Sequence, residues 1–271
     1  MTEKLRFTVL GCGSSGGVPR VGNQWGVCDP QNPLNRRRRC ALLIEAIGGD
    51  GGVTTVLIDT GADLREQLLD AQVGNLDGVL LTHPHADHIF GLDDLRQLAI
   101  SLRSSITVHM DQATADVVMQ PFGYCFHQSP GSSYPPFCQQ ETITHGVASI
   151  IDGQGGRISA MPLLAEHGDI HALGFRIADV AYLPDMKRIT DPTSLDALQG
   201  CRILIIDALR HEPHPSHMNL QESLAFIERI GPEKAILTNM ATELDYAALQ
   251  AQLPEHVIPA HDGLQLTIPM A

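Results

Sequence analysis

The feature that most constrains this chain is a cluster of four potential metal ligands within six residues. His83, His85, Asp87 and His88 follow residues 78–81, a short apolar run that indicates the end of a buried strand. Turns at the carboxyl ends of strands in open α/β sheets usually hold the functional site. Imidazole nitrogens and a carboxylate suit zinc, manganese or iron. The pattern therefore favours a metal centre at a strand end over an exposed histidine-rich turn without a metal.

Length and composition limit the class of protein. The 271 residues, 43% of them hydrophobic, can bury a core in one large α/β domain or two small ones. No apolar run approaches the roughly 18–20 residues that span a bilayer, and the first residues enter a predicted strand instead of a signal peptide. We therefore expect a cytoplasmic protein without a membrane partner. Six scattered cysteines should be reduced there.

The charge of the chain argues against one class of partner. The formal net charge is −13, so a broad basic surface is not expected. Stable binding of nucleic acid depends on such a surface, because the phosphate backbone must be neutralised. An anionic small substrate remains compatible with the composition, because metal ions can supply local positive charge.

Four consecutive arginines are an exception in this acidic chain. They lie after a glycine-rich segment, residues 11–20, that follows a strand predicted at residues 5–10. This segment is not a phosphate-binding P-loop, because no Gly-Lys-Ser/Thr follows its glycines. The arginines form either a solvated basic edge or an anion site, since a guanidinium binds phosphate through two hydrogen bonds. The predicted phosphate-binding residues are Arg36, Arg37, Arg38 and Arg39.

A carboxylate at a second strand end adds to the predicted site. Residues 40–47 and 53–59 predict a hairpin across a glycine-rich turn, and its second strand ends at Asp59. A carboxylate there can orient a metal-binding imidazole through its second nitrogen. The alternative is that Asp59 caps a helix predicted at residues 63–71.

The remaining chain repeats strands and helices without a linker or a short-period repeat. We predict strands at 105–110, 157–165, 203–206, 235–238 and 256–259, and a hairpin at 173–183. We predict helices at 92–102, 112–120, 193–199, 219–230 and 245–253. The last helix but one carries a capping box, Asn219 with Glu222. Together these elements predict one α/β domain over residues 1–271, built of two packed sheets flanked by helices.

Residues 121–140 hold most of the aromatic side chains together with many turn residues. We predict that this segment is an insertion or lid that forms part of a pocket or of a subunit interface, and hence of a homodimer.

Several later strands also end in polar residues that can complete a metal centre. His167 and Asp185 each follow an apolar run, as Asn239 and His261 do further on. A carboxylate can bridge two cations about 3.5–4 Å apart, and such a pair lowers the pKa of a bridging water. The sequence therefore permits a site with two metal ions and a hydroxide nucleophile at neutral pH.

The order of these residues resembles a known family. The motif His83-X-His85-X-Asp87-His88, with Asp59 before it and His167 and Asp185 after it, resembles the metallo-β-lactamase superfamily. This resemblance implies a four-layer αββα sandwich. The glycine-rich segment and the arginine run resemble the phosphodiesterase branch, which includes the phosphoribosyl cyclic phosphodiesterase and, more distantly, the endonuclease that matures transfer RNA 3′ ends.

The resemblance also implies roles for individual residues. His83, His85 and His167 would hold one divalent ion, zinc or manganese, and Asp87 and His88 the second, with Asp185 as the bridge. His217 resembles the catalytic histidine of this branch, which gives a proton to the leaving oxygen; His211 and His214 are nearby alternatives. The predicted catalytic residues are His217 and Asp87.

One position departs from the superfamily pattern. A histidine usually follows the strand at 235–238, where this chain has Asn239. An amide oxygen is a weaker ligand for a borderline metal, so the second ion would be bound more loosely or would use His261. Cys28 and Cys40 lack the close cysteine cluster of some relatives, so no structural zinc is expected.

Three functions follow as hypotheses. The first is a dinuclear metal-dependent phosphodiesterase acting on a small anionic phosphate ester such as a cyclic nucleotide. The second is a thioester or lactone hydrolase with the same fold. The third is a nucleotide-binding protein whose second metal site has degraded. The arginine run and His217 favour chemistry at phosphorus.

Overall fold

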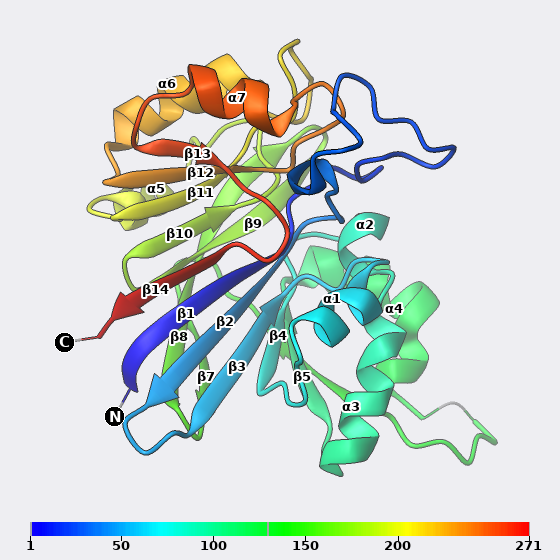
Figure 1. Cartoon of the computed structure of the whole chain (residues 1–271). Coiled ribbons are helices and arrows are strands. Elements are labelled where there is room, and N and C mark those ends of the chain that lie inside the picture. The colour runs from blue at the N-terminus through cyan, green and yellow to red at the C-terminus, as the bar shows by residue number, and fades with distance from the viewer. Residues whose placement is uncertain (1, 129, 271) are drawn as a thin grey trace.

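The computed structural model describes residues 2–128 and 130–270. Two seven-stranded sheets face each other, and helices cover the outer face of each sheet (Figure 1). The predicted four-layer αββα sandwich is therefore confirmed.

The first sheet contains the first and last strands of the chain side by side. Its order is β14 (Gln265–Pro269), β1 (Thr2–Gly11), β2 (Ala41–Gly48), β3 (Val53–Ile58), β4 (Gly78–Leu80), β5 (Ile106–Met110) and β6 (Cys138–Thr142). Strands β14 to β3 pair antiparallel, and β3 to β6 pair parallel. The parallel half directs the ends of its four strands toward the same edge.

The second sheet repeats this arrangement. Its order is β13 (Val257–Pro259), β12 (Lys234–Thr238), β11 (Ile203–Asp207), β10 (Val180–Leu183), β9 (Ile170–Ile177), β8 (Gly156–His167) and β7 (Ser149–Gly153). Strands β13 to β10 pair parallel, and β10 to β7 pair antiparallel.

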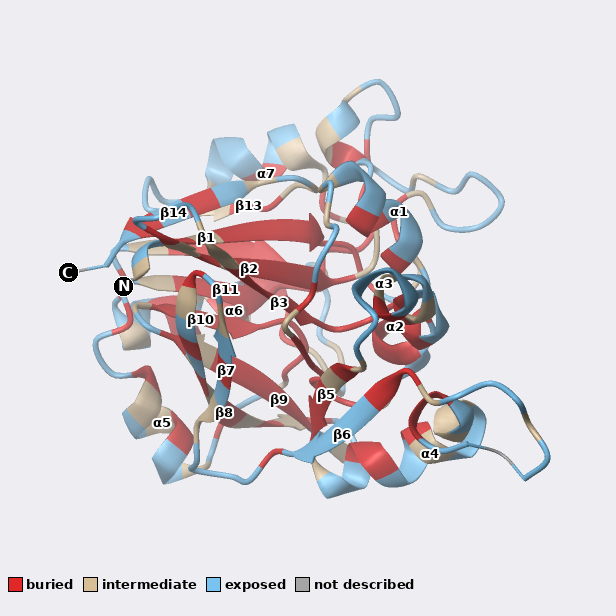
Figure 2. Cartoon of the chain, turned by 90° about the horizontal axis from the view of Figure 1, so that it is seen from below, coloured by how far each residue is buried: buried red, intermediate tan, exposed pale blue. Residues whose placement is uncertain are grey.

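The central strands are buried on both faces, which explains their nearly continuous apolar sequences. In β2, Leu42 and Ile44 belong to the core between the sheets, whereas Leu43 belongs to the core under the outer helices. Side chains alternate between the faces of a strand, so both faces need apolar residues when both are covered. Buried residues accordingly fill the interior of the sandwich (Figure 2).

Helices α1 (Leu64–Asp70), α2 (Ala86–Ile89), α3 (Leu95–Leu102) and α4 (Gln112–Phe126) cover the first sheet, and α5 (Pro192–Leu198), α6 (Leu220–Ile230) and α7 (Tyr246–Gln252) the second. Pro33–Asn35 and Leu92–Asp94 are short 3-10 helices. The predicted capping box of α6 is confirmed: Asn219 accepts from the Glu222 N–H, and Glu222 accepts from the Asn219 N–H.

The segment 121–140 begins and ends in regular structure. Helix α4 continues through Pro121 to Phe126, and residues 138–140 belong to β6. None of its residues lines the pocket beside the metal-ligand cluster described below. Residues 134–137 instead line a separate pocket against α3, and the predicted role of the segment as a lid stays a prediction. The homodimer contact stays a prediction.

Three strands were not predicted. Strand β6 is polar and mostly exposed at the edge of its sheet, and β7 and β14 are five residues long. In such short edge strands the apolar pattern spans too few residues to be distinct.

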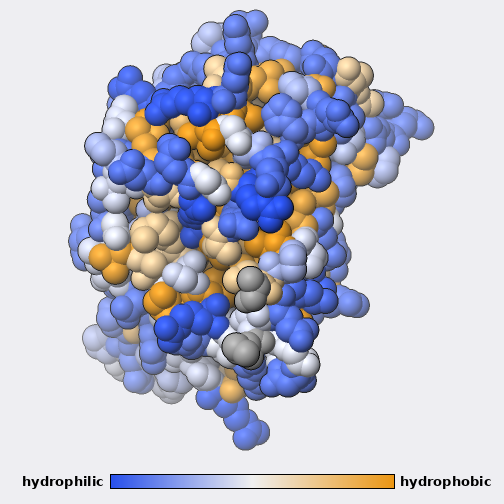
Figure 3. Space-filling view, turned by 90° about the vertical axis from the view of Figure 1, so that its left-hand side faces the viewer, coloured by the Kyte–Doolittle hydropathy of each residue, from blue (hydrophilic) through white to orange (hydrophobic). Residues whose placement is uncertain are grey.

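The surface is mixed in character. On the face in Figure 3, hydrophobic residues show in short stretches between hydrophilic ones. Among the described residues, no helix combines the length and the apolar character that crossing a membrane requires.

Candidate metal centre

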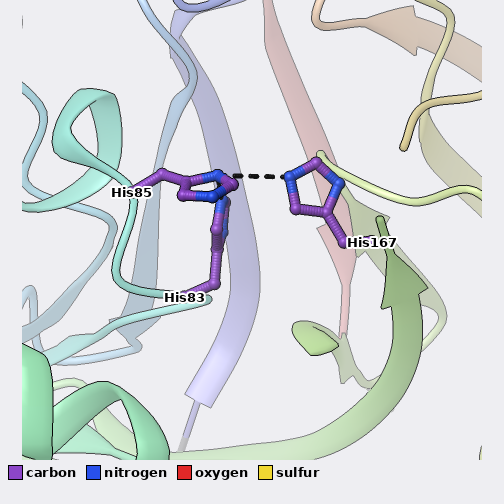
Figure 4. A group of neighbouring side chains, drawn as sticks. All are labelled: His83, His85 and His167. Atoms are coloured by element: carbon purple, nitrogen blue, oxygen red, sulfur yellow. Dashed lines mark hydrogen bonds between the residues drawn. The ribbon is translucent and has the colours of Figure 1, made fainter. Parts of the chain in front are cut away.

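The predicted ligands meet where several strands end. His83 and His85 lie between β4 and α2, and His88 lies on α2. His167 is the last residue of β8, and Asp185 follows β10. The two sheets thus contribute facing halves of one site, as Figure 4 shows for His85 and His167.

Three imidazoles form the first group of ligand atoms. His85 Nδ1 lies 2.9 Å from His83 Nε2 and 3.2 Å from His167 Nε2. Asp185 Oδ2 is 3.9 Å from His83 Nε2 and 3.8 Å from His167 Nε2. His83, His167 and Asp185 are buried, whereas His85 is exposed.

Hydrogen bonds on the far side of two rings fix where their lone pairs point. His167 Nδ1 lies 2.9 Å from the Ser216 carbonyl, which only accepts, so Nδ1 donates. Thr82 donates to Asp59 at 2.9 Å and therefore accepts from His83 Nδ1 at 2.9 Å. Both Nε2 atoms are then unprotonated in the neutral rings and face His85. His85 Nδ1 can donate to only one of them, and a cation would satisfy all three.

A second group of ligand atoms lies on the other side of Asp185. His88 Nε2 is 3.4 Å from Asp185 Oδ1 and 3.4 Å from Asp87 Oδ2. Its other nitrogen, Nδ1, donates to Asp59 at 2.7 Å. Asp59 is fully buried and also accepts from the Thr82 N–H at 2.8 Å. This is the contact that the predicted orienting role of Asp59 requires.

The electrostatics of this second group fit a cation. Asp185 Oδ1 is buried without a hydrogen-bond partner among the described residues. Burial opposes charge on His88, but Asp185 and Asp59 raise the pKa of His88 well above its usual value. A proton on His88 therefore partly balances the negative charge of Asp185 and Asp59, and a divalent ion would balance it more fully. The donor set is compatible with two ions that share Asp185.

A carboxylate and a histidine form a pair beside the ligands. Asp207, the last residue of β11, accepts from His217 Nδ1 at 2.8 Å and from the Met186 N–H at 3.0 Å. Burial raises the pKa of Asp207 to about 7. Burial opposes charge on His217, whereas its hydrogen bond to Asp207 raises the pKa of His217. Asp207 therefore favours a proton on His217.

Asn239 and His261 do not join the ligand groups. Asn239 Nδ2 donates to Asp207 Oδ1 at 3.2 Å and lies 3.0 Å from His217 Nδ1. His261 is half-buried, and its Nδ1 contacts the Asp262 carbonyl at 3.0 Å. The structure thus corrects the use of His261 as a substitute ligand, and it places Asn239 beside the Asp207–His217 pair.

Asp59 and Asn239 have unusual backbone conformations. Their φ angles are 68° and 59°, in the left-handed region. Asparagine and aspartate adopt this region more readily than most residues. Such strain concentrates at functional sites, where the surroundings hold it in place.

The ligand groups open into a pocket of about 390 Å³. His85, Asp87, His167, Asp185 and His217 line one part of it. Its other lining residues come from the glycine-rich segment and from the loops after β11 and β12: Ser14, Ser15, Gly16, Arg20, Leu209, Arg210, His214, Ser216 and Ala241.

The arginine run does not reach this pocket, which corrects its predicted role in binding phosphate. Arg37 is only 2% exposed and donates to the Ala241 carbonyl at 3.3 Å. Arg38 pairs with Asp70, and Arg39 pairs with Asp63 at 2.8 Å. Arg36 is exposed and also lies outside the pocket lining. The charges of Arg38 and Arg39 are therefore committed to structural ion pairs.

Arg20 and Arg210 are the arginines of the pocket lining, and the sequence did not single them out. Arg20 is half-exposed and lies 3.6 Å from Glu243. Arg210 donates to the Glu212 and Pro213 carbonyls at 3.3 and 3.0 Å. The sequence could have indicated Arg20 as a pocket residue, because it ends the glycine-rich segment. It could also have indicated Asp207 as a site residue, because Asp207 ends a strand.

Comparisons with known proteins agree with this geometry. The model of the beta-lactamase superfamily domain matches residues 54–240. The crystal structure of a diphosphatase from the PhnP family has 33% sequence identity and a TM-score of 0.87, covering 100% of this chain and 99% of that chain.

Two curated relatives carry different names. The octanoyltransferase of Porphyromonas gingivalis is 33% identical over 271 residues, 97% of this chain and 52% of that protein. The ribonuclease Z of Bradyrhizobium diazoefficiens is 32% identical over 193 residues, 67% of this chain and 60% of that protein. This chain thus spans about half of the first relative and three fifths of the second. The matches and the ligand clusters show that the chain belongs to the metallo-β-lactamase superfamily, in its PhnP-like branch.

Proposed function

We propose that this chain is a dinuclear metal-dependent phosphodiesterase that hydrolyses a small phosphate ester. The observation that carries this proposal is the shared carboxylate: Asp185 separates two groups of ligand atoms that open into one pocket beside the Asp207–His217 pair. The similarity to a diphosphatase and to a ribonuclease Z supports chemistry at phosphorus.

The first ion would be held by His83, His85, His167 and Asp185, and the second by Asp87, His88 and Asp185. We propose zinc or manganese, which accept both imidazole and carboxylate. Divalent ions in such a site lower the pKa of water and stabilise negative charge on phosphoryl oxygens.

Residues of the chain supply a proton for the leaving oxygen and positive charge for the anionic substrate. Asp207 favours a proton on His217 through their hydrogen bond, and His217 lines the pocket. His217 would therefore give a proton to the leaving oxygen through Nε2 while Asp207 fixes the ring through Nδ1. At the other part of the pocket, the guanidiniums of Arg20 and Arg210 attract an anionic substrate.

The acyl alternative is tested in the same experiment. The name of the P. gingivalis relative points to acyl chemistry, but this chain covers only 52% of that protein. The assay compares bis-p-nitrophenyl phosphate with a thioester, each with manganese and with zinc. We expect turnover of the phosphate diester; turnover of the thioester alone would refute the proposal, and no turnover with fewer than two bound ions would favour a binding protein.

The role of His217 has a matched control in the same loop. His217→Ala should lower kcat on the diester roughly 10²–10⁴-fold, because it removes the general acid. His211 is exposed and does not line the pocket, so His211→Ala should leave kcat unchanged. Equal effects of the two substitutions would exclude His217 as the acid.

A further inference from the structure

We propose that the turn at residues 14–17 is a subsite for an anionic phosphoryl oxygen, formed by the Ser14 hydroxyl and the N–H groups of Ser15 and Gly16. The inference deepens the proposed function and rests on it for the identity of the ligand. Three independent features carry it: an unpartnered hydroxyl, free backbone donors, and a support that fixes the turn.

Ser14 is a buried donor that faces the pocket. It is 6% exposed and lines the same pocket as His85, Asp87 and His217. Among residues 2–128 and 130–270, its hydroxyl has no hydrogen-bond partner, and it is not one of the unpartnered polar atoms that are sealed from solvent. A hydroxyl that lines a pocket and is not engaged by another group of the protein is free to donate to a ligand there.

The backbone of the turn offers two more donors. The Gly17 N–H donates to the Ser14 carbonyl at 2.7 Å and closes the turn. Within the described part of the chain, the N–H groups of Ser15 and Gly16 have no acceptor. Successive backbone N–H groups in a turn form a concavity that binds anions.

The arginine run supports this turn from behind, which gives that sequence motif a function. The Arg38 carbonyl accepts from the Gly13 N–H at 2.7 Å, and the Arg37 carbonyl accepts from the Val18 N–H at 2.9 Å. Both ends of the turn are therefore held by one segment of chain.

The side chain of Arg39 acts on the middle of the turn. Its Nε donates to the Ser15 carbonyl at 3.0 Å, and Arg39 does not line the pocket. The carbonyl is thus directed away from the pocket. Asp63 in turn holds Arg39 through an ion pair of 2.8 Å, so this arrangement is fixed before a ligand binds.

The same turn needs glycine and positions a cation. Gly17 has a φ angle of 64°, and a Cβ at Gly16 would lie 3.1 Å from Arg20 Cγ. The Arg20 side chain therefore passes closely over Gly16 on its way to the pocket. A hydroxyl, two N–H groups and a guanidinium are all donors, and this combination selects a ligand with several acceptor oxygens on one centre, as in phosphate.

The test measures binding of inorganic phosphate to the metal-loaded protein by calorimetry, independently of turnover. We expect Ser14→Ala to weaken phosphate binding roughly tenfold or more, because it removes a hydrogen bond to a charged oxygen. Ser14→Thr keeps the hydroxyl and should retain most of the affinity. Ser101 is exposed on α3 and outside the pocket, so Ser101→Ala should bind phosphate as the parent does.

The outcomes separate this inference from the proposed function. Unchanged phosphate affinity in Ser14→Ala, with unchanged metal content, would refute the subsite; absence of phosphate binding by the parent protein would refute it too. Phosphate binding that depends on Ser14, without hydrolysis of the diester, would refute the phosphodiesterase and keep the subsite. A Ser14→Ala protein that fails to fold leaves Ser14→Thr as the deciding variant, and loss of binding there would refute the subsite.

Discussion

At the scale of the residue, the centre depends on groups that bind the imidazoles on the side opposite the ligand atoms. Asp59, Thr82 and the Ser216 carbonyl each bind the far nitrogen of an imidazole. These contacts set the tautomer and the orientation of His83, His88 and His167, so that one nitrogen of each ring faces the other ligands.

The orienting role of Asp59 gives a prediction about metal affinity. Asp59→Asn should weaken binding of one ion roughly 10–100-fold, because an amide holds the His88 N–H less strongly than a carboxylate. Titration against a chelator with known metal affinity measures the loss. Asp116, exposed on α4, provides the control Asp116→Asn, for which we expect the affinity of the parent. Unchanged affinity in both variants would show that Asp59 does not act through His88.

Local sequence was sufficient for part of the site only. His83, His85, Asp87 and His88 were found because they lie within six residues after a strand, and His167 and Asp185 because each ends an apolar run. The arginine run was misjudged because its partners are distant in sequence. Asp63 lies 24 residues beyond Arg39, and the Ala241 carbonyl lies 204 residues beyond Arg37. Charge along the chain cannot reveal such pairs.

At the scale of the element, each strand delivers its last residues to the centre. Asp207 ends β11, His167 ends β8 and Asp185 follows β10, so the register of the second sheet sets their spacing. The long central strands and the capped helices were predictable, because both faces of the strands are apolar and the caps are local signals. The edge strands β6, β7 and β14 were not, because pairing with a neighbour defines them more than their own sequence does.

Helix α6 offers a prediction about a single cap. Asn219 caps the helix two residues after His217, and its partner Glu222 also pairs with Lys187 at 2.7 Å. Asn219→Ala should lower the free energy of unfolding by about 1 kcal/mol, since it leaves the Glu222 N–H without its acceptor. Urea denaturation measures this loss. Asn75 lies in an exposed loop, so Asn75→Ala should leave the free energy of unfolding nearly unchanged, and equal effects would contradict the role of the cap.

At the scale of the whole molecule, the two ends of the chain meet in one sheet. Strand β14 pairs with β1, and Asp262 just before β14 accepts from the Arg38 N–H at 2.8 Å and the Cys12 N–H at 3.2 Å. The support of the glycine-rich turn therefore includes a carboxylate from the far end of the sequence.

This carboxylate makes stability depend on pH. Burial raises the pKa of Asp262 to about 6, above its usual value of 3.8. The folded protein then binds the proton more tightly than the unfolded chain, so this stabilisation is complete below pH 4 and is lost as the pH rises through 6. Asp262→Asn does not titrate, and its loss of stability from pH 4 to pH 7 should be smaller by about 2 kcal/mol. Chemical denaturation at both pH values measures the difference. A slope equal to that of the parent would contradict the assignment, and Asp50→Asn in the exposed β2–β3 turn is the control.

The pairing of β1 with β14 also bears on how the protein is made. Ribosomes synthesise chains at about 5–20 residues per second, so roughly 13–50 seconds separate the emergence of β1 from that of its partner. During this interval one long edge of β1 is unpaired, and Cys12 and Arg38 lack the carboxylate of Asp262. His83, His85 and His88 are therefore synthesised well before the carboxylate that supports the glycine-rich turn beside them.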